Sequence, residues 1–449
     1  MSIRHINNRV KAGDKVVFVS TAFAVCMVLF SYGVLSSAVD LRLFLPELVA
    51  CSALVVVCVS VLLLIPCGYQ NRRVSVFILL MAALFRLLFV AAAPQLSDDV
   101  YRYLWDGLQL LQGHNPYALA PQQVVTLSAP LATLQSQINH PHLVTIYPPA
   151  AQLFFALAGG QLLGFKLLCI LVDLGSCILL AGLLRRLNRS PWWLTIYAWH
   201  PLVVLECAGS GHIDVLAVFF VLAALTMALS TRRYAGWYSG VLVMLAVLTK
   251  VFPVIFAPFL WLMLPTDQRR GFVVGAVTTA MVLLGAFAPA IINGVETLTT
   301  YSRHWEFSGF TFQQLRLWLH SGDQARLLLA TLFGLTLVVA WWRLKSIQPF
   351  DPWSVVRTLM ALVLVFLLLT PTLHPWYALY LVAFATLVPH PAALVLSWSV
   401  LLSYQVVSHY HLTGVWQERA DLSFYIWLAP LLALLASAVF SRLSRRANS

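Results

Sequence analysis

Long apolar runs separated by short polar loops recur along the whole chain. Most of these runs come close to the ~20 residues that an α-helix needs to cross a bilayer. They are continuously apolar rather than alternating, which excludes a transmembrane β-barrel. We therefore predict an all-α integral membrane protein, a bundle of about 14 transmembrane helices, over residues 16–36, 46–66, 74–93, 165–184, 191–208, 212–230, 235–251, 252–264, 271–291, 325–345, 355–373, 376–390, 393–408 and 422–440.

These runs organise residues 1–449 as a single polytopic membrane domain. The predicted parts are N-terminal spans over 1–93, an outer loop with an acidic motif over 94–164, core spans over 165–292, a second outer loop over 293–324 and C-terminal spans over 325–449. The apolar stretch 147–164 is left out of the spans, because its two prolines and its paired glycines fit poorly with a full crossing. We expect an interfacial or re-entrant helix there.

Charge sets the orientation. The net charge is +12, yet only 10% of residues are charged and the mean hydropathy is +0.85. The cations form no patch interleaved with aromatic residues, so nucleic acid is not a predicted partner. Most of the 28 Lys and Arg residues lie in 4–15, 72–73, 185–189, 232–233, 269–270, 343–357 and 442–446. The positive-inside rule then predicts a cell (inner) membrane protein with both termini cytoplasmic and both long loops on the outer, periplasmic face.

The first outer loop concentrates charge in a chain that is otherwise almost free of it. On a helix that begins near Ser97, acids and an arginine would share faces with aromatic residues. Acids beside a bilayer are costly, and this favours a functional role over an ordinary capped, salt-bridged interfacial helix. The candidate catalytic residues are Asp98 and Asp99, with Arg102, Tyr103 and Asp106 in support.

A second polar cluster lies at the outer end of two later spans. Glu206, His212 and Asp214 fall at one membrane depth, where a site and a buried polar network are equally good interpretations. Lys250 is expected near the same boundary, where its ammonium could meet a phosphate; snorkelling is the alternative. The other candidate binding residues predicted on this side are Asn115, Tyr117, Tyr147, Arg303, His374, Trp376 and Tyr377.

Several other chemistries lack their motifs. Asp98 and Asp99 form a plain acid pair rather than the spaced carboxylates of a divalent-cation site, and the seven cysteines have no metal-ligand spacing. Gly209-Ser210-Gly211 is not the Gly-x-Ser-x-Gly elbow of a serine hydrolase. No Gly-rich phosphate loop is present. We assign no metal ligand.

The polar motifs together resemble the GT-C superfamily of lipid-linked-sugar-dependent glycosyltransferases, and within it the bacterial polyprenol-phosphate-mannose-dependent, mannosyltransferase-like members. The similar features occur in family order over about 280 residues. They are Asp98-Asp99, Arg102-Tyr103, Asn115-Pro116-Tyr117, Tyr147-Pro148-Pro149, Gly211-His212-x-Asp214, Lys250-x-x-Pro253 and His374-Pro375-Trp376-Tyr377.

The resemblance implies transfer of a hexose, with mannose favoured, from a polyprenyl-phosphate donor to a glycan or lipid acceptor on the outer face, with inversion. Asp98 would be the general base. The other implied roles are orientation of the base or the sugar by Asp99 and Asp106, support of the acids by Arg102, substrate positioning by His212 and Asp214, and donor-phosphate binding by Lys250, Arg303 and His374. A mostly apolar groove between spans would hold the prenyl chain, and membrane lipid would surround the protein. The family has metal-dependent and metal-free members, so a divalent cation stays an option and no cofactor is assigned.

Two other functions compete with this one. A transporter or flippase of a polar or lipid-linked solute should place acids in mid-membrane and break helices at paired positions. A polymerase or ligase of polyprenyl-diphosphate-linked glycans should emphasise arginines in a large outer loop. Here the charges cluster at one face, and the first loop is acidic. This pattern favours a transferase.

Overall fold

The structure, a computed structural model, describes residues 3–65, 68, 70–125, 128–347 and 351–447, with side chains near the two ends described from 17 and up to 439. The described residues are helices and loops, apart from two isolated β-bridges. The elements up to the end of the first long loop are α1 (Ile3–Ser37), α2 (Leu45–Leu63), α3 (Arg72–Val90), α4 (Asp99–Leu111), η1 (Pro121–Gln123), α5 (Ala129–Ser136) and α6 (Pro149–Ala156).

The second half of the chain continues as helices of very unequal length. The central elements are α7 (Leu162–Arg186), η2 (Pro191–Leu194), α8 (Thr195–Ala198), α9 (Pro201–Val204), η3 (Leu205–Gly209), α10 (Asp214–Ala228), α11 (Ala235–Val247), η4 (Phe252–Phe256), α12 (Ala257–Met263) and α13 (Thr266–Ala286). The last are α14 (Ile291–His304), α15 (Phe310–Leu319), α16 (Gly322–Ser346), α17 (Pro352–Leu369), η5 (Pro375–Ala378), α18 (Leu379–Leu387), α19 (Pro391–Ser399), η6 (Val400–Tyr404), α20 (Gln405–Thr413) and α21 (Ala420–Ala447).

The prediction of a multi-span helical membrane protein is confirmed. Within the described residues, nine helical segments are long and apolar enough to cross a bilayer, and four shorter apolar helices add to them. Each of these segments falls on one of the predicted spans. Span 46–66 ends at Pro66, which lies outside the described residues. In the stretch 147–164, helix α6 has only eight residues. It is about 12 Å long and cannot cross a bilayer by itself.

The predicted span 191–208 is the exception, because no single helix covers it. The chain forms short 3₁₀, α and π turns from η2 to η3, with Pro191 and Pro201 each starting a new piece. Nearly every side chain in this stretch is buried. Irregular backbone is tolerated at membrane depth where protein surrounds it. The apolar composition of 191–208 gives no sign of this interruption. Glu206 lies in its last turn, η3.

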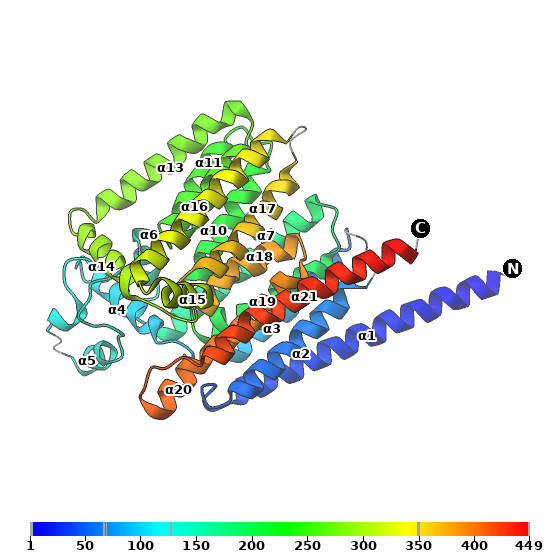
Figure 1. Cartoon of the computed structure of the whole chain (residues 1–449), viewed down its shortest axis with the longest axis horizontal. Helices are drawn as coiled ribbons and strands as arrows, with labels where there is room; N and C mark the ends of the chain where they lie inside the picture. Colours follow the sequence, from blue (N-terminus) through cyan, green and yellow to red (C-terminus); the bar gives the residue numbers. More distant parts are fainter. Residues whose placement is uncertain (1–2, 66–67, 69, 126–127, 348–350, 448–449) are drawn as a thin grey trace.

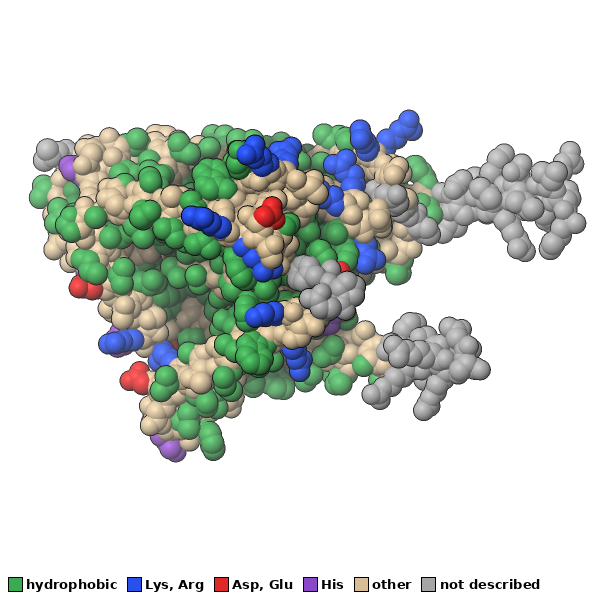
Figure 2. Space-filling view, turned by 90° about the horizontal axis from the view of Figure 1, so that it is seen from above, with side chains coloured by type: hydrophobic (Ala, Val, Ile, Leu, Met, Phe, Trp, Pro, Cys, Tyr) green, Lys and Arg blue, Asp and Glu red, His purple; other side chains and the backbone are tan. Residues whose placement is uncertain are grey.

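Figure 1 shows the two termini at one end of the bundle and α4, α5, α14 and α15 at the opposite end. We call these the terminal end and the loop end. On the face shown in Figure 2, most Lys and Arg side chains lie in the half nearer the termini. Several helix faces between the two ends expose apolar side chains; on α13, for example, only Phe272 and Gly275 are buried. Such faces suit contact with lipid.

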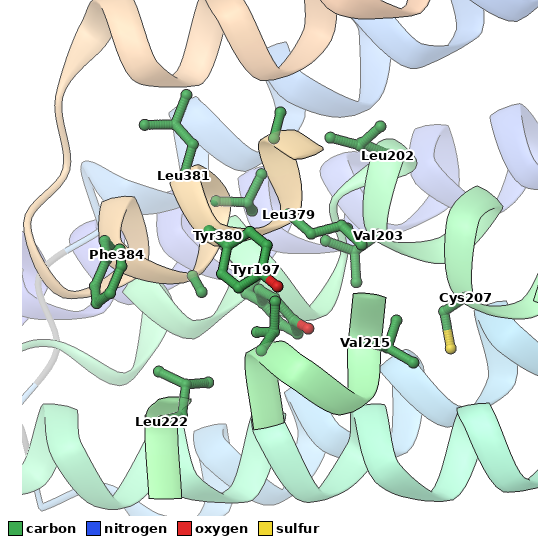
Figure 3. Packing of buried hydrophobic residues seen from close by; sticks show 14 of the residues in the cluster. Tyr197, Leu202, Val203, Cys207, Val215, Leu222, Leu379, Tyr380, Leu381 and Phe384 are labelled. Atoms are coloured by element: carbon green, nitrogen blue, oxygen red, sulfur yellow. The ribbon is translucent and has the colours of Figure 1, made fainter. Parts of the chain in front are cut away.

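The core lies where α18 meets the interrupted segment and α10. Figure 3 shows Tyr380 and Phe384 of α18 near Tyr197, Val203 and the α10 side chains. One continuous buried apolar cluster extends from Ala24 on α1 to Ile426 on α21. The predicted N-terminal, core and C-terminal stretches therefore share one core, and the site described below is built on its loop end.

A buried ion pair that the sequence analysis did not single out joins α3 to α7. Arg86 Nε lies 2.5 Å from Asp173 Oδ2, and both side chains are fully buried. Arg86 also donates to the Ala198 carbonyl at 2.8 Å, and the Tyr197 hydroxyl donates to Asp173 at 2.7 Å. Because each charge has protein partners, the cluster ties the interrupted segment to two long helices.

Helices α11 and α13 approach each other through glycines spaced four residues apart. A Cβ at Gly236, Gly240 or Gly275 would run into the backbone carbonyl of Gln268, Phe272 or Trp237 across the interface. Small residues at this spacing let membrane helices pack backbone to backbone.

We expect Gly240→Ala to lower the stability of the purified protein by about 1–3 kcal/mol, because the new methyl group meets backbone that cannot move aside. Gly285→Ala, also on this helix pair, is the matched control, since its Cβ would meet nothing within 4 Å. Thermal unfolding in detergent should separate the two variants. Equal unfolding temperatures for the two variants would contradict this prediction and would show that α13 can shift to make room for the methyl group.

Candidate active site

The first loop builds one wall of the site by packing α4 on α6. A Cβ at Gly107 would overlap the Phe155 carbonyl, so the glycine permits the close approach. Arg102 Nε donates to Asp106 at 2.9 Å, and Gln152 of α6 donates to the other Asp106 oxygen at 3.3 Å. Arg102 therefore supports Asp106 rather than the Asp98–Asp99 pair. Tyr103 is buried and its ring stacks on that of Phe155.

Asp99 is the acid of the pair that reaches the second polar cluster. It is the first residue of α4, and the Ser97 hydroxyl accepts its backbone N–H at 3.3 Å. Its Oδ2 lies 4.0 Å from His212 Nε2 and accepts a hydrogen bond from the Tyr147 hydroxyl at 3.3 Å. The side chain keeps 28% of its surface exposed. Asp99 thus joins the buried cluster to the open loop end.

His212 is held between two carboxylates. Its Nδ1 lies 2.7 Å from Glu206 Oε2, and its Nε2 faces Asp99. The Tyr404 hydroxyl donates to the other Glu206 oxygen. The contact between His212 and Glu206 is a close approach of imidazole and carboxylate, because Glu206 Oε2 and the two ring nitrogens of His212 have no hydrogen-bond partner among the described residues. The Nε2 atom of His212 lies on the side of Asp99.

Local backbone explains why Glu206 and His212 meet. Glu206 lies in the π turn η3, and irregular turns of this kind often occur at functional sites. Gly211 then adopts φ +71°, a left-handed conformation that glycine accepts without cost. The backbone N–H of His212 donates to the Glu206 carbonyl at 2.8 Å. The chain thus folds back on itself between the two residues.

Lys250 carries the positive charge of the cluster. Its ammonium lies 2.9 Å from Asp214 Oδ2 and 5.7 and 5.5 Å from the ring centroids of Tyr147 and Tyr377. Asp214 is fully buried, whereas 19% of the Lys250 side chain is exposed. The ammonium is therefore paired with a buried carboxylate, while the Lys250 side chain stays partly exposed, so that an anionic group could approach it.

Four rings stack in a row beside this ion pair. Trp376 lies between His212 and His374, with ring centroids 3.9 and 4.3 Å away, and Phe307 stacks on the far face of His374 at 4.5 Å. Both faces of Trp376 are thus covered. The stack packs the two imidazoles against the indole, and substrate binding by Trp376 stays a prediction.

Some buried polar atoms around the cluster have no hydrogen-bond partner among the described residues. They include Asp214 Oδ1, the Tyr380 hydroxyl, Gln152 Oε1, Glu206 Oε2 and both ring nitrogens of His212. An unpaired buried polar group is unfavourable, so a bound polar molecule would stabilise the site by pairing with such atoms. The arrangement therefore suits a ligand that is rich in hydroxyl groups.

The other predicted site residues are exposed or hold the first loop together. Asp98 is exposed, and Arg303 is exposed on α14. Desolvation raises the pKa of Asp98, the Arg42 guanidinium opposes that shift, and the charge of Asp99 adds to it. The Asn115 side chain donates to the Phe287 carbonyl at 3.1 Å, and the Tyr117 hydroxyl donates to the Tyr147 carbonyl at 2.6 Å. Both therefore fix the loop in place.

Three residues of the cluster were missed by sequence reasoning. Tyr404 lies in an apolar run and carried no signal, and Phe307 looked like an ordinary loop aromatic. The Tyr301 hydroxyl lies 3.5 Å from His374 Nε2. Burial raises the pKa of Tyr301 and, together with the charge of Asp99, that of Tyr147, so both phenols stay protonated and able to donate. The available signal for Tyr301 is its position two residues before the predicted Arg303.

The described residues contain no group of three or more His, Cys, Asp or Glu side chains arranged to hold a metal ion. The two adjacent acids have different surroundings. Asp98 interacts electrostatically with Arg42, whereas Asp99 contacts Tyr147 and His212. What the cluster offers is a partly exposed carboxylate, an oriented imidazole and an accessible ammonium. These groups can accept a proton and bind an anion.

Comparison with known proteins identifies the family. The model of glycosyltransferase family 87 matches residues 145–371, more than half of the chain. The chain belongs to glycosyltransferase family 87. The resemblance to GT-C-type, mannosyltransferase-like membrane glycosyltransferases is thereby confirmed. The match includes the Glu206–His212 turn and Lys250, while the acids of α4 and the His374–Tyr377 segment lie outside it.

A curated relative is the alpha-(1->6)-mannopyranosyltransferase A of Mycobacterium tuberculosis. It is 26% identical over 214 residues, an alignment that covers 44% of this chain. The matched part amounts to only 40% of the relative's own length. No solved structure matches this family 87 chain.

Proposed function

We propose that this family 87 protein moves a hexose, with mannose favoured, from a polyprenyl-phosphate donor to a glycan or lipid acceptor on the outer, periplasmic face of the membrane, with inversion. The observation that carries the proposal is the convergence of Asp99, His212, Lys250 and His374 at the loop end of a membrane bundle. The name of the mycobacterial relative supports mannose as the sugar.

The proposed reaction is a single displacement. The acceptor hydroxyl loses its proton to a carboxylate while its oxygen attacks the anomeric carbon, and the bond from that carbon to the phosphate oxygen breaks. The products are the new glycoside and polyprenyl phosphate. Asp99 is well placed to accept the proton because it is partly exposed and bonded to Tyr147. Asp98, the base predicted from the sequence, stays the rival, and its raised pKa would make its carboxylate more basic than an ordinary aspartate.

Lys250 would bind the donor phosphate as negative charge develops on it, with His374 nearby as a hydrogen-bonding group. Asp214 would keep the ammonium oriented. His212, which lies between Glu206 and Asp99, would position Asp99 or a sugar hydroxyl. The proposal assigns no role to a divalent cation, and adding EDTA to the transfer assay tests for one.

The direct test uses purified protein in detergent or nanodiscs, radiolabelled polyprenyl-phosphate mannose and lipid acceptors extracted from cells that lack the gene. We expect label to move to an acceptor and polyprenyl phosphate to be released in equal amounts. A nucleotide-linked mannose, offered instead, should give no product. Transfer from the nucleotide donor alone would overturn the donor assignment.

A flippase would move the lipid-linked sugar without cleaving it. Proteoliposomes that contain the labelled donor separate the two functions, because only a transferase releases polyprenyl phosphate. Movement of the labelled donor from one leaflet to the other without cleavage of its sugar–phosphate bond would favour the flippase. Family membership and the clustering of charge at one end support the transferase.

The proposed orientation can be measured by cysteine labelling of intact cells. Gln122 lies near the loop end and is exposed. A second labelling position is needed on the predicted cytoplasmic side. Asp267 suits it because its side chain is exposed, whereas the side chain of the neighbouring Gln268 accepts a hydrogen bond from the Gly236 N–H. In a background without the native cysteines, an impermeant maleimide should label Gln122→Cys and spare Asp267→Cys. The reverse pattern would place the site in the cytoplasm.

A further inference from the structure

A groove between α16 and α17 lies at the terminal end of the bundle, away from the candidate active site. The two helices run side by side there (Figure 1). The groove encloses about 660 Å³, a volume in the range of ligand sites. Its walls are largely apolar side chains, among them Leu332, Leu335, Val339 and Val365. These walls belong to two helices that are predicted to cross the bilayer.

Charge is concentrated at one end of this groove. Arg343, in the last turn of α16, and Arg357, in the second turn of α17, both line it. Ser354 and Thr358 add hydroxyl groups on the same side. Between the arginines and the far end of the groove, Thr336 is the remaining polar lining residue. The groove therefore has an apolar body and a cationic mouth.

The two arginines differ in their protein contacts. Arg357 donates to Asp351 Oδ2 at 2.9 Å and to the Ser354 hydroxyl at 3.1 Å, with 55% of its side chain exposed. Arg343 is exposed, and within the described part of the chain no acidic side chain forms an ion pair with it. Asp351 thus neutralises Arg357 but not Arg343, which leaves a net positive charge at the mouth.

We propose that this groove binds an anionic phospholipid, with the phosphate between Arg343 and Arg357 and an acyl chain along the apolar wall. Guanidinium groups bind phosphate oxygens through paired hydrogen bonds. The Ser354 hydroxyl donates to Asp351 and accepts from Arg357, so it holds the Arg357 guanidinium in place at the mouth. The acyl chain fits the membrane-facing walls. The site is independent of sugar transfer and lies at the other end of the molecule from Lys250.

Native mass spectrometry of protein released from nanodiscs that contain phosphatidylglycerol and phosphatidylcholine in equal amounts tests the proposal. We expect retained phosphatidylglycerol on the wild type. Arg343→Gln/Arg357→Gln should weaken that retention roughly 30-fold, because each cation near the lipid surface contributes a few-fold to tenfold in affinity. Arg232→Gln/Arg233→Gln is the matched control, since both are exposed cations in the loop between α10 and α11 and do not line the groove.

A second variant tests the apolar part without changing charge. Ala361 lines the groove and is exposed. Ala361→Phe should fill it and also release phosphatidylglycerol, while folding is checked by thermal unfolding. Unchanged retention in the charge variant, or equal retention of phosphatidylcholine, would overturn the proposal. Displacement of phosphatidylglycerol by an equal amount of polyprenyl phosphate would also overturn it, because the groove would then hold the carrier lipid instead.

Discussion

Asp99→Asn is expected to reduce sugar transfer by about 10²–10⁴-fold, the usual contribution of a general base. The substitution keeps the shape of the side chain and its contact with Tyr147, so the protein should purify and unfold as the wild type does. The measurement is initial-rate transfer from polyprenyl-phosphate mannose, with polyprenyl phosphate release followed in parallel. Loss of turnover at unchanged donor binding would place Asp99 in the chemical step.

Asp98→Asn is the matched control, one residue away and exposed. If Asp99 is the base, Asp98→Asn should retain activity within about tenfold, and the acid limb of its pH–rate profile should stay where the wild type has it. If Asp98 is the base, its raised pKa means that protonation inactivates the enzyme at a higher pH than an ordinary aspartate would allow. Wild-type activity in Asp99→Asn together with an inactive Asp98→Asn would return the role to Asp98.

The helical architecture could be predicted because bilayer-spanning helices must be long and apolar. The same rule fails at 191–208, where the sequence is as apolar as any span but the backbone is broken. Hydropathy depends on composition alone, and a segment that is buried inside protein on all sides can be as apolar as one that faces lipid. The prolines at 191 and 201 were the available signal, and they were outweighed by the length of the run.

The candidate site was only partly predictable. The family-ordered motifs led to residues that the structure brings together, such as His212, Lys250 and Trp376. The ion-pair partner of Arg102 was harder to predict. Asp98 and Asp99 lie one helical turn before it and Asp106 one turn after it, and the structure pairs it with Asp106. Asp98 and Asp99 are adjacent in sequence, and only the start of α4 decides which one faces His212. Tyr404 joins through a contact almost 200 residues distant, which no local pattern encodes.

Lys250→Met is expected to destabilise the protein by about 3–5 kcal/mol, because it leaves the fully buried carboxylate of Asp214 without its partner. Asp214→Asn/Lys250→Met removes both charges and should recover most of the lost stability. That double variant should still be unable to transfer sugar, since the cation proposed for the donor phosphate is gone. Thermal unfolding measures the first effect, and transfer from polyprenyl-phosphate mannose measures the second.

The combination separates a structural ion pair from a substrate-binding one. A purely structural Lys250 predicts that the double variant regains both stability and activity. A phosphate-binding Lys250 predicts recovered stability with a large rise in KM for the donor or a loss of kcat. Arg303→Gln offers a comparison, because Arg303 is exposed and the described residues give it no ion pair with Asp214. Wild-type turnover in the Asp214→Asn/Lys250→Met protein would remove Lys250 from the reaction, and the phosphate would then need Arg303 or His374.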